Sequence, residues 1–220
     1  MLMEEEDSDD KIKIVLLGQA FTGKTSLINV YYFNQFDNSV KPTTASSCVD
    51  KVINTSKGKV SIRIWDTAGH EKFRCMNKIF IKNTKIAVFV YDITRKSTFN
   101  ELKFWLDYTE KCLGKDVAVY GLVGNKLDLF DKKEEVLKEN KDNEFDIVPH
   151  DDGEKYAQDI GAAFCETSAK EYAPGFEELI VNLVEEYLSR DNKNKKIKGK
   201  KSHSFHLNKE KTKKKKWLCC

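Results

Sequence analysis

Residues 12–26 read IKIVLLGQAFTGKTS, a short apolar run that leads into a glycine-containing segment and then into a helical pattern. The segment GQAFTGKT matches G-x-x-x-x-G-K-[ST], a phosphate-binding loop between a strand and a helix. Gly18 and Gly23 allow backbone N–H groups to surround phosphate oxygens at the positive end of the helix. We expect Lys24 to reach the β- and γ-phosphates and the Thr25 hydroxyl to bind Mg²⁺. The loop predicts a nucleotide site in an α/β fold, and alone it does not distinguish ATP from GTP.

Strand-like and helix-like segments alternate along the chain. The runs IKIVLL, VSIRIW, IAVFVY and VAVYGLV are short and rich in β-branched residues, and helix-length stretches separate them. The segment NTSKGK is typical of a hairpin turn between the second and third strands. Ser97 and Asp151 are expected N-caps. Helical periodicity covers Lys24–Phe33, 97–112, 151–160 and 175–188. The pattern predicts an α/β fold, with a mostly parallel central sheet flanked by helices.

Composition favours one domain followed by a tail. The chain has 220 residues, of which 40% are hydrophobic, enough for one packed core. Residues 190–220 contain 13 Lys and Arg and two acidic residues; because the whole chain carries +3, residues 1–189 carry −8. Because the basic charge lies in the tail and residues 1–189 are acidic, the part of the chain formed by residues 1–189 is not expected to bind nucleic acid. We expect an acidic disordered N-terminus (1–10), one domain (11–189) with a surface insertion at about 130–150, and a basic disordered tail (190–220).

Neither a signal peptide nor a membrane-spanning helix is expected. The start MLMEEEDSDD lacks a basic and an apolar region, so we expect synthesis in the cytosol. The apolar runs are far shorter than the ~18 residues of a spanning helix. Four cysteines, at 48, 75, 112 and 165, are scattered without metal-ligand spacing, so only the pair at the end of the chain is informative.

The tetrapeptide NKLD, residues 125–128, directly follows the apolar run VAVYGLVG. Ligands of α/β sheets bind at the carboxyl ends of strands. There Asp128 can accept hydrogen bonds from the N1–H and the amino group of guanine, whereas adenine would leave the carboxylate unpaired at a cost in free energy. A polar turn after a strand is the alternative. The position of NKLD about 100 residues after the phosphate loop favours a guanine site.

Five ordered motifs resemble the guanine-nucleotide boxes of Ras-like GTPases, which are P-loop NTPases with a Ras-like G domain. They are GQAFTGKT, Thr43, DTAG from Asp66, NKLD, and ETSAK at residues 166–170. The resemblance implies that Ala169 donates its N–H to the guanine carbonyl and that Ser168 supports Asp128. It also implies that Lys126 flanks the base and that Phe36 covers the base edge. The nucleotide-binding residues that it implies are Gly18, Gln19, Ala20, Phe21, Thr22, Gly23, Lys24, Thr25, Ser26, Phe36, Thr43, Asp66, Gly69, Asn125, Lys126, Asp128, Ser168, Ala169 and Lys170.

Within that superfamily the chain is most similar to the Rab branch. VFVYDIT, IRIWDTAG, and STFNELKFW with Trp105 carry this likeness. Two features depart from the branch: TASSC at residues 44–48, where Rabs usually carry an Ile-Gly-x-x-Phe-like segment, and the insertion after Leu129. The resemblance implies a GTP-binding and GTP-hydrolysing switch that regulates vesicle traffic by recruiting effectors. An ATP-using P-loop enzyme is a distant alternative, which Asp128 opposes.

The resemblance also assigns the switch chemistry. Thr25, Thr43 and Asp66 would bind Mg²⁺, and the Gly69 N–H would contact the γ-phosphate. The two segments at about 35–50 and 67–76 would then change on hydrolysis. Lys24, Gly69 and His70 are the implied catalytic residues.

His70 stands where the family carries a water-orienting glutamine. A neutral imidazole ring nitrogen either donates or accepts, whereas a carboxamide does both. We therefore expect slow intrinsic hydrolysis, which an activating protein that brings its own glutamine and an arginine would relieve. The alternative is a hydrolysis-deficient, GTP-bound docking module.

The chain ends in KTKKKKWLCC. A terminal Cys219–Cys220 pair resembles the doubly geranylgeranylated ends of Rabs, and two lipid chains, or one with basic residues, anchor stably. A solvated end is the alternative for the Lys run alone. The expected partners are guanine nucleotide, effectors, an exchange factor, an activating protein, a prenylation escort and a GDP-dissociation inhibitor. We expect a monomer on the cytoplasmic face of an endosomal or other trafficking membrane, with a cytosolic pool.

Overall fold

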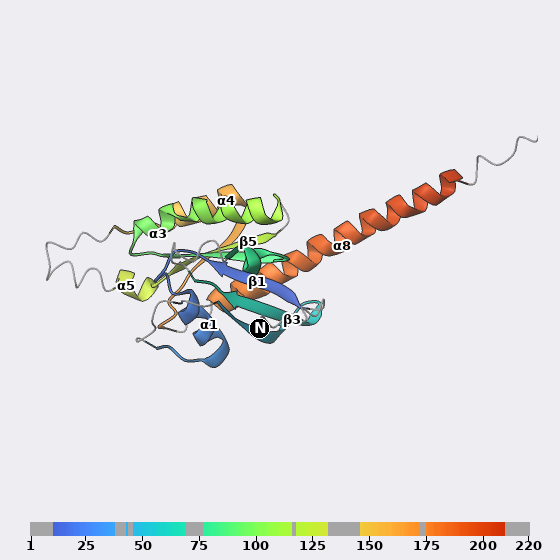
Figure 1. The fold of residues 1–220 in the computed structure, drawn as a ribbon. Helices are drawn as coiled ribbons and strands as arrows, with labels where there is room; N and C mark the ends of the chain where they lie inside the picture. The colour runs from blue at the N-terminus through green and yellow to red at the C-terminus, as the bar shows by residue number, and fades with distance from the viewer. Residues whose placement is uncertain are drawn as a thin grey trace, which may run out of the picture.

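The computed structural model describes residues 11–37, 43, 46–68, 77–115, 118–131, 146–171 and 175–209. One sheet holds six strands in the order β2-β3-β1-β4-β5-β6 (Figure 1). Only the β2–β3 pairing is antiparallel. The strands are β1 Ile12–Leu17, β2 Ser47–Thr55, β3 Gly58–Asp66, β4 Ile86–Asp92, β5 Val119–Asn125 and β6 Ala162–Glu166. The helices are α1 Lys24–Phe33, α2 Asn77–Ile81, α3 Lys96–Asn100, α4 Leu102–Leu113, α5 Leu127–Asp131, α7 His150–Ile160 and α8 Gly175–Lys209.

Helices cover both faces of the sheet, which confirms the predicted fold class. Alternate residues of the parallel strands point to opposite faces. Ile14 belongs to a core cluster shared with Leu27 of α1 and Leu183 of α8. Its neighbour Val15 belongs to a second cluster, shared with Trp105 of α4. Because both faces are buried, β1, β4 and β5 are predominantly apolar rather than alternating, as the sequence runs indicated.

Several element boundaries differ from the sequence-based predictions. The predicted hairpin is confirmed, with Thr55 opposite Gly58. The single helix expected over 97–112 is interrupted between α3 and α4. Neither expected N-cap is correct, because Arg95 precedes α3 and Pro149 precedes α7. Inside α3, the Thr98 hydroxyl accepts the Asp92 N–H at 2.9 Å and so ties this turn to β4, a contact that apolar periodicity does not detect. The short elements β6, α2 and α5 were not predicted.

One residue near the end of the charged segment at 130–150, Val148, is part of the core. Most of the segment, residues 132–145, lies outside the described residues. The Lys96 N–H donates to the Asp146 carbonyl at 2.7 Å, and the Val148 N–H donates to the Ile93 carbonyl at 2.9 Å. Val148 is 1% exposed. Residues 146–148 are therefore tied to the domain through these contacts, and the surface insertion at about 130–150 otherwise stays a prediction.

Helix α8 extends farther than the apolar pattern indicated. Its described backbone is helical to Lys209 and projects beyond the sheet in Figure 1, although we expected disorder from residue 190. Lys dominates this stretch and has good helix propensity, which a search for an apolar stripe does not register. Residues 1–10 and 210–220, with Cys219 and Cys220, lie outside the described residues. Among the described helices, none has the length and apolar character needed to span a bilayer.

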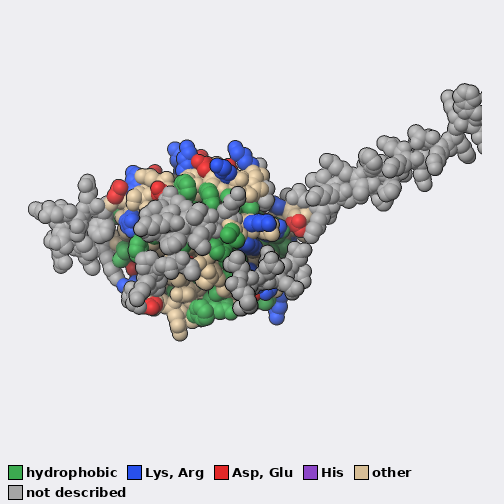
Figure 2. Space-filling model, in the orientation of Figure 1, with side chains coloured by type: hydrophobic (Ala, Val, Ile, Leu, Met, Phe, Trp, Pro, Cys, Tyr) green, Lys and Arg blue, Asp and Glu red, His purple; other side chains and the backbone are tan. Residues whose placement is uncertain are grey.

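Charged side chains of both signs lie interspersed over α3 and α4 on the face that Figure 2 shows. The buried face of α4 instead carries Leu102 and Trp105, which pack on the sheet. This division into one apolar and one solvated face is typical of a helix that covers a sheet. The outer face of α4 is thus ordinary charged surface.

Candidate nucleotide-binding site

Two glycines of the loop after β1 are required by its geometry. Gly18 has φ +151°, and a Cβ there would lie 2.2 Å from the Val90 carbonyl oxygen. Gly23 has φ +90°, and a Cβ there would lie 2.2 Å from Asn125 Nδ2. The Thr22 hydroxyl donates to the Gln19 carbonyl at 3.0 Å, and α1 begins directly after Gly23. The loop therefore fits only with hydrogen at these two positions, and it brings the N-terminus of α1 to the strand ends.

Lys24 is held inside this loop. Its ammonium donates to the Gly18 and Gln19 carbonyls, at 3.0 and 2.8 Å. Burial lowers the pKa of Lys24 to about 8, although nearby Asp66 opposes the shift. A buried ammonium among carbonyl oxygens is poorly compensated, and an anion such as a phosphate would stabilise its charged form. This is the electrostatic condition for a phosphate-binding lysine.

Three oxygen-bearing side chains from separate parts of the sequence meet beside Lys24. The Thr25 hydroxyl donates to Asp66 Oδ2 at 2.7 Å and lies 2.7 Å from the Thr43 hydroxyl. Burial raises the pKa of Asp66, while the hydrogen bond from Thr25 and the charge of Lys24 lower it. Asp66 Oδ1 is buried and has no hydrogen-bond partner among the described residues. The structure therefore brings together the three residues that the sequence assigned to a metal.

This donor set fits Mg²⁺. Carboxylate and hydroxyl oxygens are hard ligands, and Mg²⁺ usually keeps waters and phosphate oxygens beside one or two carboxylates. In the described part of the chain, no group of three or more His, Cys, Asp and Glu side chains could hold a metal. A site with Asp66 as its one carboxylate is thus consistent with a metal that is bound jointly with a phosphate. The unpartnered Asp66 Oδ1 supplies an oxygen for that purpose.

The start of the second switch segment is anchored, but its catalytic residues are not described. The Thr67 hydroxyl donates to the Leu16 carbonyl at 2.6 Å and is fully buried. Gly69 and His70 lie outside the described residues. Thr67 was missed as a site residue, although its place inside DTAG was the available signal. It fixes the chain next to Asp66 against β1.

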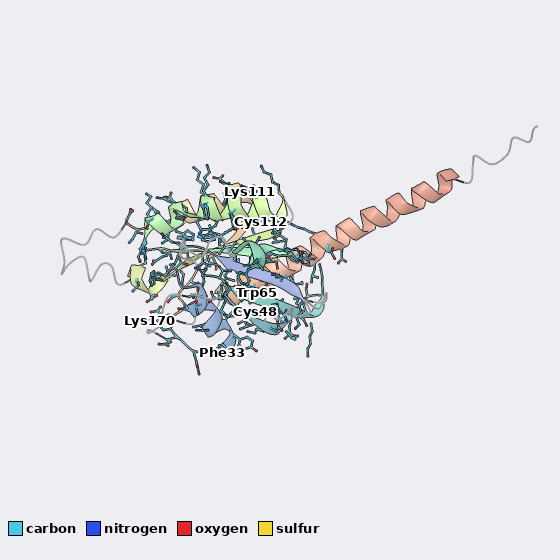
Figure 3. The ribbon with its side chains drawn as sticks, viewed as in Figure 1. Phe33, Cys48, Trp65, Lys111, Cys112 and Lys170 are labelled. Atoms are coloured by element: carbon cyan, nitrogen blue, oxygen red, sulfur yellow. The ribbon has the colours of Figure 1, made fainter. Side chains whose placement is uncertain are left out.

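A cavity of about 240 Å³ lies beside the phosphate loop. Its lining combines three of the predicted motifs: Gly23, Ser26, Phe36, Asn125, Lys126, Asp128, Leu129, Ala169 and Lys170. Lys170, labelled in Figure 3, lies at the same end of the sheet as α1 and α5. The volume is slightly below the ~300–1,000 Å³ of typical ligand pockets. Leu129 was not predicted, and only its place directly after NKLD could have indicated it.

Asp128 is oriented in this cavity by Ser168. The Ser168 hydroxyl donates to Asp128 Oδ1 at 2.7 Å, and both residues are buried. Ser168 also accepts the N–H of Lys170 at 3.2 Å, which fixes the hydroxyl. A buried carboxylate that is already fixed through one oxygen can direct the other toward a ligand with little loss of entropy. The arrangement can therefore recognise adjacent N–H donors.

Asn125 joins the phosphate loop to the ETSAK segment at residues 166–170. Its Nδ2 donates to the Thr22 carbonyl at 2.8 Å, and its Oδ1 accepts the Ala169 N–H at 3.1 Å. The Ala169 N–H, which the resemblance assigned to the guanine carbonyl, thus donates to Asn125 here. Asn125 is 1% exposed. One amide therefore satisfies two buried backbone groups that come from opposite ends of the sequence.

The remaining predicted residues lie on the loop rim. Phe21 has φ +67° and is 58% exposed, so a large aromatic residue adopts a left-handed backbone there. Gln19 Oε1 is buried without a hydrogen-bond partner among the residues described. Ala20 is partly buried between them. The loop therefore carries bulk at Phe21 where a side chain is poorly tolerated, and its physical benefit is not evident from the contacts.

The geometry of a phosphate loop, a Thr–Thr–Asp cluster and an Asp-lined cavity agrees with the comparison with known proteins. The model of the Ras family matches residues 13–189. The chain belongs to the Ras family of small GTPases. All five motifs fall within the matched span.

The relatives of this small GTPase place it in the Rab branch, as the sequence predicted. Ras-related protein Rab-21 from Canis lupus familiaris is 33% identical over 187 residues, which cover 85% of this chain and 77% of that protein. The Homo sapiens protein of the same name is also 33% identical over 187 residues, covering 85% and 76%. Family membership makes the chain a GTPase switch of membrane trafficking. Its family generally uses Mg²⁺ with GTP.

Proposed function

We propose that this chain binds GDP and GTP in the cavity beside the phosphate loop, hydrolyses GTP, and recruits effectors to vesicle membranes in its GTP form. The observation that carries the proposal is Asp128, which is 5% exposed and fixed through Oδ1 by Ser168 in a cavity next to Lys24. Guanine can satisfy this carboxylate with two donors, and adenine would leave it unpaired. Because an unpaired buried acceptor costs ~1–3 kcal/mol or more, guanine nucleotides are selected.

The phosphates would occupy the loop that holds Lys24. Its ammonium would exchange the Gly18 and Gln19 carbonyls for phosphate oxygens, which compensate a buried charge better. Thr25, Thr43 and Asp66 would hold Mg²⁺, which neutralises the charge of the phosphates. Ser26 and Lys170, at the edge of the cavity, would contact the nucleotide from either side.

The switch would depend on Thr43. Its hydroxyl lies 2.7 Å from that of Thr25, so Thr43 is held at the phosphate site through this contact. A γ-phosphate contacted by the Gly69 N–H on the other side would hold both segments, and its loss would release them. The surface formed by about 35–50 and 67–76 is therefore the proposed binding surface for effectors, the exchange factor and the activating protein.

The base site is tested by replacing Asp128 with Asn. The change exchanges one acceptor oxygen for a donor that faces the amino group of guanine, so preference should move from guanine toward xanthine nucleotides. Equilibrium binding of GDP and XDP to purified Asp128→Asn and to the unaltered protein measures this. Equal GDP affinity of the two proteins would refute the assignment of the base site.

Two alternatives for GTP hydrolysis are separated by single-turnover rates measured with and without a Rab-type activating protein, and replacing His70 tests whether this residue limits the rate. With His70 as a poor orienter of water, the chain is a slow GTPase that depends on an activating protein; alternatively it is a GTP-bound docking module that does not turn over. His70→Gln should raise single-turnover hydrolysis about tenfold or more, or ~1.4 kcal/mol in the barrier. Rates are compared across pH 5.5–8, where an unperturbed imidazole titrates near ~6.5. Equal rates throughout, with unchanged GTP dissociation, would exclude His70 as the cause.

Membrane attachment is proposed to reside in Cys219 and Cys220, prenylated with the help of an escort and extracted by a GDP-dissociation inhibitor. The neighbouring Lys213–216 run, KKKK, would add ~1 kcal/mol per residue near an anionic leaflet. The address would be the cytoplasmic face of an endosomal or other trafficking membrane, with a cytosolic pool. Replacing both cysteines by Ser should leave a protein that binds GTP and no longer sediments with membranes; persistence in the membrane fraction after a moderate salt wash would rule out prenylation as the anchor.

A further inference from the structure

Asp92 is a buried carboxylate next to two residues, Asn125 and Lys126, that line the cavity beside the phosphate loop, which is called the base cavity below. It is the last residue of β4 and lies opposite Asn125, the last residue of β5. Asp92 is 1% exposed. Its Oδ1 accepts the Thr94 N–H at 3.0 Å and the Thr94 hydroxyl at 2.7 Å. A buried carboxylate is costly unless it is hydrogen-bonded and paired, and the next contact supplies a cation.

That cation is Lys126. The Lys126 ammonium lies 2.7 Å from Asp92 Oδ2. The backbone of Lys126 has φ +71°, a left-handed conformation that a residue with a Cβ rarely adopts. A residue in such a conformation persists when its surroundings determine it, and strained residues cluster at ligand sites. The Lys126 side chain is therefore fixed at both ends, through its strained backbone and through Asp92.

The fixed side chain belongs to the base cavity. Lys126 lines the cavity together with Asp128, two residues farther along the chain. With its ammonium held by Asp92, the side chain has fewer conformations to lose when a base enters. Without Asp92, the ammonium would turn to water, because the Lys126 side chain is 30% exposed and has a path to solvent. The wall of the cavity would then be mobile.

We propose that Asp92 is a positioning residue for guanine-nucleotide binding: it holds the Lys126 ammonium and thereby sets the Lys126 side chain as a wall of the base cavity. The proposal rests on the nucleotide site proposed above. It assigns Asp92 no contact with the base, so the choice of guanine over other bases should not depend on it. Its effect is on how long the nucleotide stays bound.

The test is a double-mutant cycle on the dissociation rate of fluorescent GDP. Asp92→Asn keeps the acceptor for Thr94 and removes the charge that holds Lys126; Lys126→Met keeps an apolar wall and removes the ammonium. Asp92→Asn alone should speed GDP release about tenfold, within the range of coupling between residues in contact. In the Lys126→Met background the same change should alter the rate less than twofold, because the partner is absent. An equal acceleration in both backgrounds, or none in either, would overturn the proposal.

Two further measurements separate positioning from support of the fold. Thr94→Val removes one hydrogen bond to Asp92 and leaves the Asp92–Lys126 pair, so GDP release should stay within twofold of the unaltered protein. Acceleration by Thr94→Val equal to that by Asp92→Asn would show that the turn sets the rate, and would refute the role of Lys126. If Asp92→Asn does not fold, Lys126→Arg replaces it: Arg keeps the pair and should release GDP more slowly than Lys126→Met, and equal release would overturn the proposal.

The preference for GDP over XDP is recorded for each variant. It should remain that of the unaltered protein, since Asp128 is untouched, and a shift would contradict the proposed indirect role. Failure of the unaltered protein to bind GDP would instead refute the proposed function itself.

Discussion

Replacing Asn125 by Ala should weaken nucleotide binding, because the Asn125 amide holds together two backbone segments of the site. The change deletes the amide that pairs the Thr22 carbonyl, at 2.8 Å, with the Ala169 N–H, at 3.1 Å. Both backbone groups belong to residues that are 0% and 5% exposed. Leaving one buried polar group unsatisfied costs ~1–3 kcal/mol. The adjacent cavity gives water partial access to the space left by the Asn125 side chain. We therefore expect the summed cost of leaving both backbone groups unsatisfied to be about 2–3 kcal/mol, near the low end of the range for two groups.

This cost should appear in the lifetime of the complex. Because most affinity differences within one binding site lie in the dissociation rate, ~2–3 kcal/mol corresponds to roughly 30- to 150-fold faster GDP release. The assay is release of fluorescent GDP into excess unlabelled GDP, with thermal unfolding recorded on the same samples. Asn125→Asp retains the acceptor for Ala169 and loses the donor to Thr22, so its rate should be intermediate.

Asn54 on the exposed part of β2 provides the matched control. Asn54→Ala removes the same atoms from a residue that joins no buried groups, and GDP release should not change. If Asn125→Ala released GDP within threefold of the unaltered protein, the amide would not connect the two loops energetically, and the reasoning from its hydrogen bonds would be refuted.

Three other predictions follow from single residues. The pKa of Lys24 is about 8, and phosphate binds its charged form. GDP affinity, measured by equilibrium titration, should therefore fall about tenfold between pH 7 and pH 9. Constant affinity would show that Lys24 stays protonated. Gly23→Ala places a Cβ 2.2 Å from Asn125 Nδ2 at φ +90°, so the variant should release GDP at least about tenfold faster, and an unchanged rate would contradict the close approach. A hydrogen bond to Glu166, at 2.6 Å, raises the pKa of His150, so this pair should stabilise the fold below the ordinary His pKa and lose its effect as pH rises through the raised value. His150 is mostly exposed, so His150→Gln should lower the free energy of unfolding by only ~0.2–0.5 kcal/mol at pH 6 and not at pH 9, checked by urea unfolding; an equal loss at both pH values would exclude the charge as its cause.

The sequence alone determined those features that local physics controls. The glycines at 18 and 23 and the apolar run before them predicted the phosphate loop, because only a glycine tolerates those conformations and because a buried parallel strand is predominantly apolar. The boundaries of α1 were also predicted, since its buried residues recur at helical spacing. The order of the motifs predicted the Ras family, which needs no knowledge of contacts.

Tertiary structure decided which polar atoms meet. Asn125 and Thr22 are 103 positions apart, and Thr25 and Asp66 are 41 apart, so no local signal indicates that they form hydrogen bonds. Nor does the sequence reveal that Asp92, an acid at the end of an apolar strand, holds Lys126. Residue types and spacing fix which elements form, because those choices depend on neighbours along the chain. The partner of a buried polar side chain depends on how strands and loops are placed side by side, and only the packed sheet sets that placement.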